Sequence, residues 1–126
     1  MLIDKLKSRV NADAGLVHRG RWVNLTFILG ISNDDYLISI VAGKITAIRR
    51  RQLATDTGEF SIRASAKGWA KHWQAIPPRD YHDIFAMLPK QIAKIDGRLE
   101  PLMQNLQYFK DIIAKMRNEE GDTNGH

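Results

Sequence analysis

The sequence of 126 residues contains no cysteine. This absence excludes disulfide cross-links, thiolate nucleophiles and cysteine-ligated zinc sites. A chain without disulfides suits a reducing compartment, and we expect the protein to be cytoplasmic. A domain of this length buries about two thirds of the surface of its unfolded chain, so it can fold without cross-links.

Long hydrophobic runs are also absent. The longest apolar stretch, FILGI, covers only residues 27–31, whereas a membrane-spanning helix needs about 20 residues. The first ten residues, MLIDKLKSRV, include four charged side chains where a secretory signal would be continuously apolar. We therefore expect neither a membrane span nor a secretory signal.

The common motifs of nucleotide binding and catalysis are missing as well. The sequence contains no G-x-x-x-x-G-K-[ST], no G-x-G-x-x-G and no G-x-S-x-G pattern. The four histidines do not pair at the spacings of two or four residues that are typical of metal ligands. We predict no cofactor and no metal site.

Charge is in excess on the positive side, with a net charge of +5. A positive surface attracts phosphates and anionic lipids weakly, so a weak contact with anionic membranes is one predicted interaction. The only dense basic cluster is Arg49–Arg51, and charged residues at a strand end commonly discourage edge pairing. Because no aromatic signature of an RNA-binding sheet accompanies this cluster, we predict no specific nucleic-acid partner.

The first half of the sequence shows one helical pattern followed by strand patterns. Residues 2–10 place their apolar side chains near one helical face, and residues 21–31 alternate apolar and less apolar positions with a period of two. Residues 36–50 read as a hairpin that turns at Gly43, and residues 59–66 alternate again. This region predicts three or four consecutive antiparallel strands.

The second half is mainly helical in pattern. Helices are predicted over residues 67–75, over 80–88 with Asp80 as N-cap, and over 98–116, with an extended segment at 93–96 before the last one. The order of helix, antiparallel strands and helices predicts an α+β fold in which helices cover one face of the sheet.

We predict a single domain over residues 1–118. The remaining residues, 119–126, are polar and are expected to form a disordered tail.

Aromatic residues and histidines give the strongest local hints of a site. Trp69 and Trp73 lie four residues apart on one helical face, where they form either a core pair or an aromatic platform for nucleic acid or a sterol-like ring. His82 lies in the phrase PPRDYHDIF, whose aspartates are explained more simply as helix-capping residues. An enzyme that acts on a steroid-like or polyketide-like substrate, with His72 or His82 as general base, remains an alternative.

Three sequence segments occur in an order that is typical of one known family. They are FSIRASAKGWAKHW, FAMLPK and AKIDGRLEPLMQNLQYF, and the hairpin LISIVAGKITAI precedes them. In this order they resemble the sterol carrier protein type 2 superfamily over most of residues 20–115. The residues that match its closing strand and helix are Lys94, Ile95, Asp96, Gly97, Leu99, Leu102 and Met103. The C-terminal TNGH is not a peroxisomal address, so the resemblance indicates a small bacterial cytoplasmic relative rather than a peroxisomal carrier.

The resemblance implies a mostly antiparallel sheet of about five strands, with helices packed on one face and an apolar tunnel enclosed between them. It also implies non-catalytic binding or transfer of a hydrophobic ligand such as a fatty acyl, isoprenoid or steroid-like lipid. The inward faces of the predicted strands and helices give the candidate ligand-binding residues. These are Phe27, Leu29, Trp69, Trp73, Phe85, Met87, Leu102, Met103, Leu106 and Phe109. A third hypothesis for the function is a protein-interaction subunit with an apolar groove. Besides the lipid ligand, a second copy of the chain in a homodimer is a candidate partner.

Overall fold

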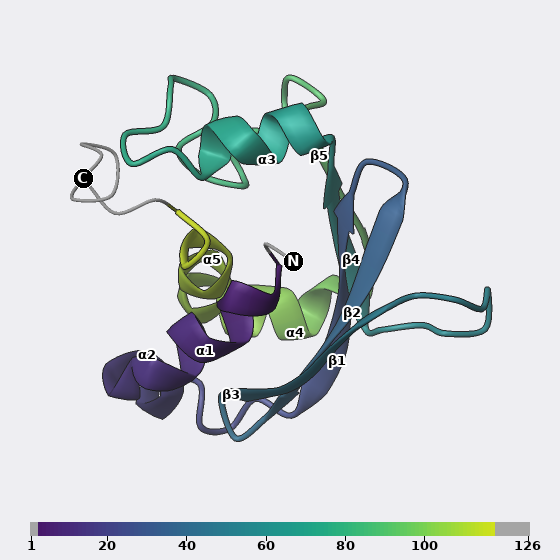
Figure 1. The fold of residues 1–126 in the computed structure, drawn as a ribbon, viewed down its shortest axis with the longest axis vertical. Coiled ribbons are helices and arrows are strands. Elements are labelled where there is room, and N and C mark those ends of the chain that lie inside the picture. Colours follow the sequence, from purple (N-terminus) through teal and green to yellow (C-terminus); the bar gives the residue numbers. More distant parts are fainter. Residues whose placement is uncertain (1–2, 118–126) are drawn as a thin grey trace.

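The protein has one five-stranded sheet with all of its described helices on one face. The computed structural model describes residues 3–117 (Figure 1). In chain order, the elements are α1 (Asp4–Ala12), α2 (Ala14–Arg19), β1 (Leu25–Ile31), β2 (Asp34–Val41), β3 (Lys44–Arg50), β4 (Phe60–Ala64), α3 (Ala66–His72), β5 (Ala93–Gly97), α4 (Leu99–Gln104) and α5 (Leu106–Ala114). The predicted tail at residues 119–126 lies outside the described residues. The α+β fold class is confirmed.

The strand order is β3-β2-β1-β4-β5. All neighbours pair antiparallel except β1 and β4, which run parallel, with Ile28 opposite Ser61. The sheet is therefore mostly antiparallel, as predicted, but β4 does not continue the meander of the first three strands. It returns to the other side of β1, which places α3 above the end of β1.

The β2–β3 hairpin turns where the sequence predicts it. Ala42 and Gly43 both have positive φ angles, 51° and 81°, as in the two-residue turns that match the twist of a hairpin. A Cβ atom on Gly43 would lie 2.4 Å from the carbonyl oxygen of Val17. The phenol of Tyr108 donates a hydrogen bond to the Gly43 carbonyl at 2.6 Å, so this turn is fixed to the core.

The main core lies between the sheet and α5. Three phenylalanines from three elements pack there: Phe27 stacks on Phe60 at 5.3 Å, and Phe109 meets both rings edge-on at 5.5 and 5.1 Å. All three are almost completely buried. Burying large aromatic side chains contributes strongly to stability, and this cluster holds α5 against the sheet.

The predicted helix at residues 80–88 is wrong: the described chain forms a series of turns there. Asp80 has a φ angle of 73°, which is incompatible with an N-cap conformation. The Asp83 carboxylate accepts a hydrogen bond from the amide of Phe85 at 2.8 Å and pairs with Lys110 at 2.7 Å. These local bonds from an aspartate compete with helix formation.

The single predicted helix at residues 98–116 is in fact two helices. Asn105 interrupts it with φ −127° and ψ 35°, outside the helical region. Its side-chain amide donates a hydrogen bond to the carbonyl of Pro101 at 3.1 Å. This side-chain bond takes the place of a backbone bond, and the chain changes direction between α4 and α5.

Candidate functional site

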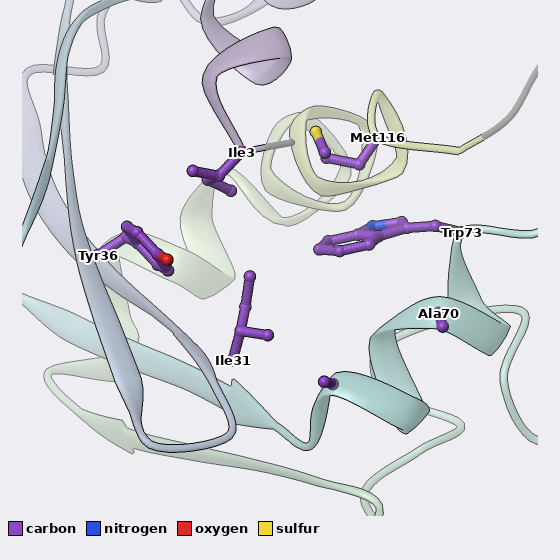
Figure 2. Close-up of a pocket in the computed structure, with 7 residues that line it drawn as sticks. Ile3, Ile31, Tyr36, Ala70, Trp73 and Met116 are labelled. Carbon is purple, nitrogen blue, oxygen red and sulfur yellow. The ribbon is translucent and has the colours of Figure 1, made fainter. Parts of the chain in front are cut away.

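An apolar cavity of about 240 Å³ lies between α3, the C-terminal end of β1 and the segment that follows the C-terminal end of α5. It is partly open to the surface. Figure 2 shows Ile3, Ile31, Tyr36, Trp73 and Met116 arranged around the hollow, with Ala70 on α3 beside it. The lining consists of Ile3, Ile31, Tyr36, Ala66, Ala70, Trp73 and Met116.

The position of α3 over this cavity is set by bonds to the end of β1. The Ser65 hydroxyl accepts a hydrogen bond from the amide of Gly68 at 3.0 Å and caps the helix. Ser32 joins the two elements, since its hydroxyl accepts from the Ala66 amide at 2.8 Å and its own amide donates to the carbonyl of Ala64 at 2.9 Å.

Two stacked tryptophans form the wall behind α3. Trp69 and Trp73 lie 5.1 Å apart with nearly parallel rings. The Trp69 indole donates to the carbonyl of Gly30 at 2.7 Å. Trp69 is fully buried, and Trp73 lines the cavity. Trp69 is thus a core residue, whereas Trp73 turns part of its surface toward the hollow.

The small size of two side chains helps to keep the hollow open. Ala66 and Ala70 are one helical turn apart and contribute only methyl groups to the lining. Both are solvent-exposed in part of their surface. Because both alanines line the cavity, a longer side chain at either position would reduce its free volume.

Among the described residues, no charged side chain lines the cavity. Its polar groups are the Trp73 indole, which is used in a bond to the Ile113 carbonyl at 2.9 Å, and the Tyr36 hydroxyl, which points toward the hollow in Figure 2. Such a lining can take up an apolar group through the hydrophobic effect. These seven residues offer no carboxylate, imidazole or thiol for acid–base or nucleophilic chemistry.

The ten predicted ligand-binding residues are distributed over the core and the surface. Trp73 is the one that lines this cavity. Met103 is 53% exposed on α4, and Phe85 and Leu106 are partly buried. The remaining six are buried in the core: Phe27, Leu29, Trp69, Met87, Leu102 and Phe109. Whether any of the ten contacts a ligand stays a prediction.

Sequence reasoning did not select the other lining residues, although it contained signals for some of them. Ile31 continues the apolar face of β1, and Met116 continues the apolar face of the last helix. Ile3 lies on the apolar face predicted for residues 2–10. Tyr36 and Ala70 carry no such signal, because only the fold brings their segments to the cavity.

A second pocket, of about 200 Å³, is polar and includes both histidines of the enzyme hypothesis. The His72 Nδ1 atom lies 2.7 Å from the carbonyl of Tyr81, so it carries the proton and donates. Its Nε2 atom is buried without a partner among the described residues. Burial lowers the pKa of His72 below its ordinary value.

The charges of this second pocket are largely paired. Asp83 pairs with Lys110, and Asp111 pairs with Arg19, each at 2.7 Å. Neither histidine lines the apolar cavity. The arrangement therefore does not place a base beside an apolar substrate site.

The basic cluster Arg49–Arg51 is matched by acids. Arg49 pairs with Asp56, Arg50 with Asp34, and Arg51 with Asp35. These pairs reduce the positive field that a nucleic-acid backbone would require.

Within residues 3–117, no group of three or more acidic or histidine side chains is arranged to hold a metal ion. Over the same residues, no helix combines the length and apolar character needed to cross a bilayer.

No family model matches the sequence, and no curated protein shows significant sequence similarity to it. Solved structures are similar nonetheless. A crystal structure of sterol carrier protein 2 matches with a TM-score of 0.73 and 9% identity, covering 94% of this chain and 95% of that chain. The conserved hypothetical protein TT1886 of Thermus thermophilus, described as possibly a sterol carrier protein, matches with a TM-score of 0.62 and 9% identity over 91% and 85% of the two chains. The ubiquinone synthesis protein UbiJ-SCP2 matches with a TM-score of 0.59 and 13% identity over 90% and 85%.

These likenesses cover at least 90% of this chain at identities of 9–13%. They agree with the strand order and the one-sided helix layer described above. The resemblance seen in the sequence is confirmed at the level of the fold: the chain has the sterol carrier protein 2 fold.

Proposed function

We propose that the protein binds a hydrophobic ligand in the apolar cavity beside α3 and carries it without catalysing a reaction on it. The ligand class is a lipid with a large apolar portion, such as a fatty acyl, isoprenoid or steroid-like molecule.

The observation that carries this proposal is the composition of the cavity lining. A volume of about 240 Å³ is surrounded by aliphatic, aromatic and methionine side chains, with no charged residue among those described. An apolar cavity of about 150 Å³ is already large enough to take up benzene. Methionine in the lining, here Met116, can adapt its shape to different apolar guests.

The similar structures support the same class of ligand. Two of them are named as sterol carrier proteins, one of these as a possible one, and a third is named as a ubiquinone synthesis protein. These names refer to lipids with large apolar portions, and such lipids are the ligand class that we propose for the cavity.

Simple energetics set the expected affinity. Each buried methylene contributes about 0.8 kcal/mol, so ten contribute about 8 kcal/mol, against an association cost of about 4–15 kcal/mol. Burial of a short segment alone therefore gives weak binding. A ligand bound with micromolar affinity extends beyond the cavity and makes additional contacts at its mouth.

The test is binding by the purified protein. Native mass spectrometry is expected to show a lipid-sized mass that is lost on denaturation, and a fluorescent fatty acid is expected to bind the delipidated protein with one-to-one stoichiometry. Trp73 allows the second experiment to be read as energy transfer, because its ring lines the cavity. Competition by unlabelled fatty acid, isoprenoid alcohol and sterol ranks the ligand classes. A protein that carries no lipid and binds none of these probes would refute the proposal.

A further inference from the structure

One tryptophan of the protein is exposed beside a hairpin turn with basic residues around it. Trp22 has 79% of its surface exposed, whereas Trp69 and Trp73 are buried. Val41, at the end of β2, is 54% exposed. We define the Trp22 surface as Arg21, Trp22, Val41, Ala42 and Lys44, all of which are exposed.

The two segments of the Trp22 surface are bonded to each other. The Asn24 side chain accepts a hydrogen bond from the amide of Ala42 at 2.8 Å, and its amide group donates to the carbonyl of Trp22 at 3.3 Å. The amide of Gly43 donates to the carbonyl of Val23 at 3.3 Å. The hydrogen bond from Tyr108 to the Gly43 carbonyl also ties the hairpin turn to the core. Because these bonds already fix the backbone of the Trp22 surface, binding requires little further ordering of it.

The Trp22 surface is positively charged. The Arg21 guanidinium lies 5.4 Å from the centre of the Trp22 ring, and neither Arg21 nor Lys44 forms an ion pair with any side chain that the structure describes. No aspartate or glutamate occurs in residues 14–33 or 36–55, which supply both segments. The nearby basic residue in sequence, Arg19, is paired with Asp111, so its charge is already compensated.

We propose that the Trp22 surface docks on an anionic lipid bilayer. Tryptophan is favoured at membrane interfaces, where its apolar ring and its N–H group both find suitable surroundings. Basic residues beside it are attracted to anionic headgroups. The apolar part consists of one ring and one valine at a protruding turn, which is far less than the roughly 800 Å² that each partner of a stable protein complex buries. A bilayer therefore fits this surface better than a protein partner.

This surface is separate from the ligand cavity. β1 begins three residues after Trp22 and ends at Ile31, which lines the cavity, so the two sites lie about 20 Å apart along the strand. The Trp22 surface is at the end of the sheet away from α3, in the lower part of Figure 1. Docking at one site does not require that the other holds a lipid, so the two proposals fail independently.

The experiment is partitioning of the full chain onto vesicles of phosphatidylcholine alone and of phosphatidylcholine mixed with phosphatidylserine. We expect sedimentation with the mixed vesicles only, and release at high salt because the charges are then screened. Lys44→Gln or Arg21→Gln is expected to weaken partitioning about fivefold each. Trp22→Ala is expected to weaken it several-fold. The matched controls are Lys67→Gln and Ile76→Ser, which remove an exposed charge and an exposed apolar side chain elsewhere and should change nothing.

Fluorescence identifies the docking residue directly. The emission of wild type is expected to shift to shorter wavelength on mixed vesicles, and Trp22→Phe is expected to lose that shift while still sedimenting, since the two remaining tryptophans are buried. Failure of wild type to bind mixed vesicles, or equal effects of the control variants, would overturn the proposal. Binding to duplex DNA that the same three substitutions abolish, without vesicle binding, would also overturn it and assign the surface to nucleic acid.

Discussion

The indole nitrogen of Trp73 donates a hydrogen bond to the carbonyl of Ile113 at 2.9 Å, which joins the aromatic wall of the cavity to α5. Arg117, after α5, makes a second link to the end of α3, because its Nε atom donates a hydrogen bond to the carbonyl of His72 at 3.0 Å. The cavity therefore lies beside the place where the ends of α3 and α5 are held together. Its shape depends on that joint.

The joint gives the first prediction. Trp73→Phe keeps an aromatic ring but removes the indole N–H, so that the Ile113 carbonyl loses the donor that ties it to α3. We expect the free energy of unfolding to fall by about 1–2 kcal/mol, measured by urea denaturation. Trp22→Phe is the control, because that side chain is exposed and its replacement should change stability by less than about 0.5 kcal/mol. Equal stability of the two variants would show that the bond does not hold the joint.

The second prediction concerns the size of the cavity. Ala70→Phe places a ring in the hollow, and because Ala70 is exposed on α3 the fold should tolerate it. We expect the affinity for a fluorescent fatty acid to fall at least about tenfold, since more than about 1.4 kcal/mol of methylene burial is lost. Lys67→Phe, on the same helix but not in the lining, is the control and should bind the probe as wild type does. Probe binding that survives Ala70→Phe would place the ligand elsewhere in the molecule.

The parts of the fold that sequence predicted well are those fixed by local chemistry. The turn at Gly43 needs a positive φ angle and leaves no room for a side chain, and Gly97, at the end of β5, also has a positive φ of 101°. A glycine between two predicted elements marks such positions in sequence. The alternation of β1 likewise assigned Phe27 and Leu29 to the interior.

The parts that sequence missed depend on competition between local and distant bonds. The sequence pattern places Asp83 at a helix start, but its pair with Lys110 of α5 favours a turn. Asn105 lies in a strongly apolar helical pattern, and only its bond to Pro101 reveals the break. Hydrophobic periodicity does not reveal these side-chain bonds, because a continuous helix and an interrupted one share the same sequence of apolar and polar residues.

The cavity was the least predictable feature. Its lining joins Ile3 near the start of the chain to Met116 near the end, and it includes two alanines, Ala66 and Ala70, whose identity in the sequence does not indicate a hollow. Hydrophobic periodicity identifies residues that face inward, but it does not distinguish a filled core from a hollow. The large side chains of Phe27 and Phe109 fill the core between the sheet and α5. The small side chains of Ala66 and Ala70 on α3 leave the neighbouring cavity open.

The third prediction follows from His72. Burial holds its pKa below the ordinary value of 6.5, and the nearby Arg117 and His82 act in the same direction while the Tyr81 carbonyl and Asp83 oppose them. The unfolded chain therefore binds a proton at a higher pH than the folded protein does. Stability contributed by neutral His72 is complete above about pH 6.5 and decreases as the pH falls toward the lowered pKa.

Urea denaturation across this pH range tests the effect. In His72→Asn the side-chain amide can still donate to the Tyr81 carbonyl, but the side chain at position 72 no longer titrates. We expect wild type to lose stability as the pH falls below about 6.5, and the variant to lose less. The paired aspartates contribute only at lower pH, because the carboxyl pKa values of Asp13, Asp35, Asp56 and Asp83 are all lowered from 3.8. Parallel curves for the two proteins would exclude His72 as the titrating group.

The last prediction concerns Asp35 on β2, whose carboxylate accepts hydrogen bonds from Arg63 at 3.0 and 3.2 Å and from Arg51 at 3.2 Å. Asp35→Asn leaves two partly buried guanidinium groups without their counter-charge. We expect the free energy of unfolding to fall by about 1–2 kcal/mol, between the values typical of exposed and of buried pairs. Asp34→Asn is the matched control, because Asp34 pairs with an Arg50 side chain that is 63% exposed and its loss should cost less than about 1 kcal/mol.

The effect of Asp35→Asn should also shrink at acidic pH, because Arg63 holds the pKa of Asp35 low and its contribution is lost once the carboxyl is protonated. If both variants lose the same stability, the shared carboxylate is no stronger than an ordinary surface pair, and the anchoring of the β3–β4 loop through Arg51 must come from its bonds to the carbonyls of Leu53 and Ala54.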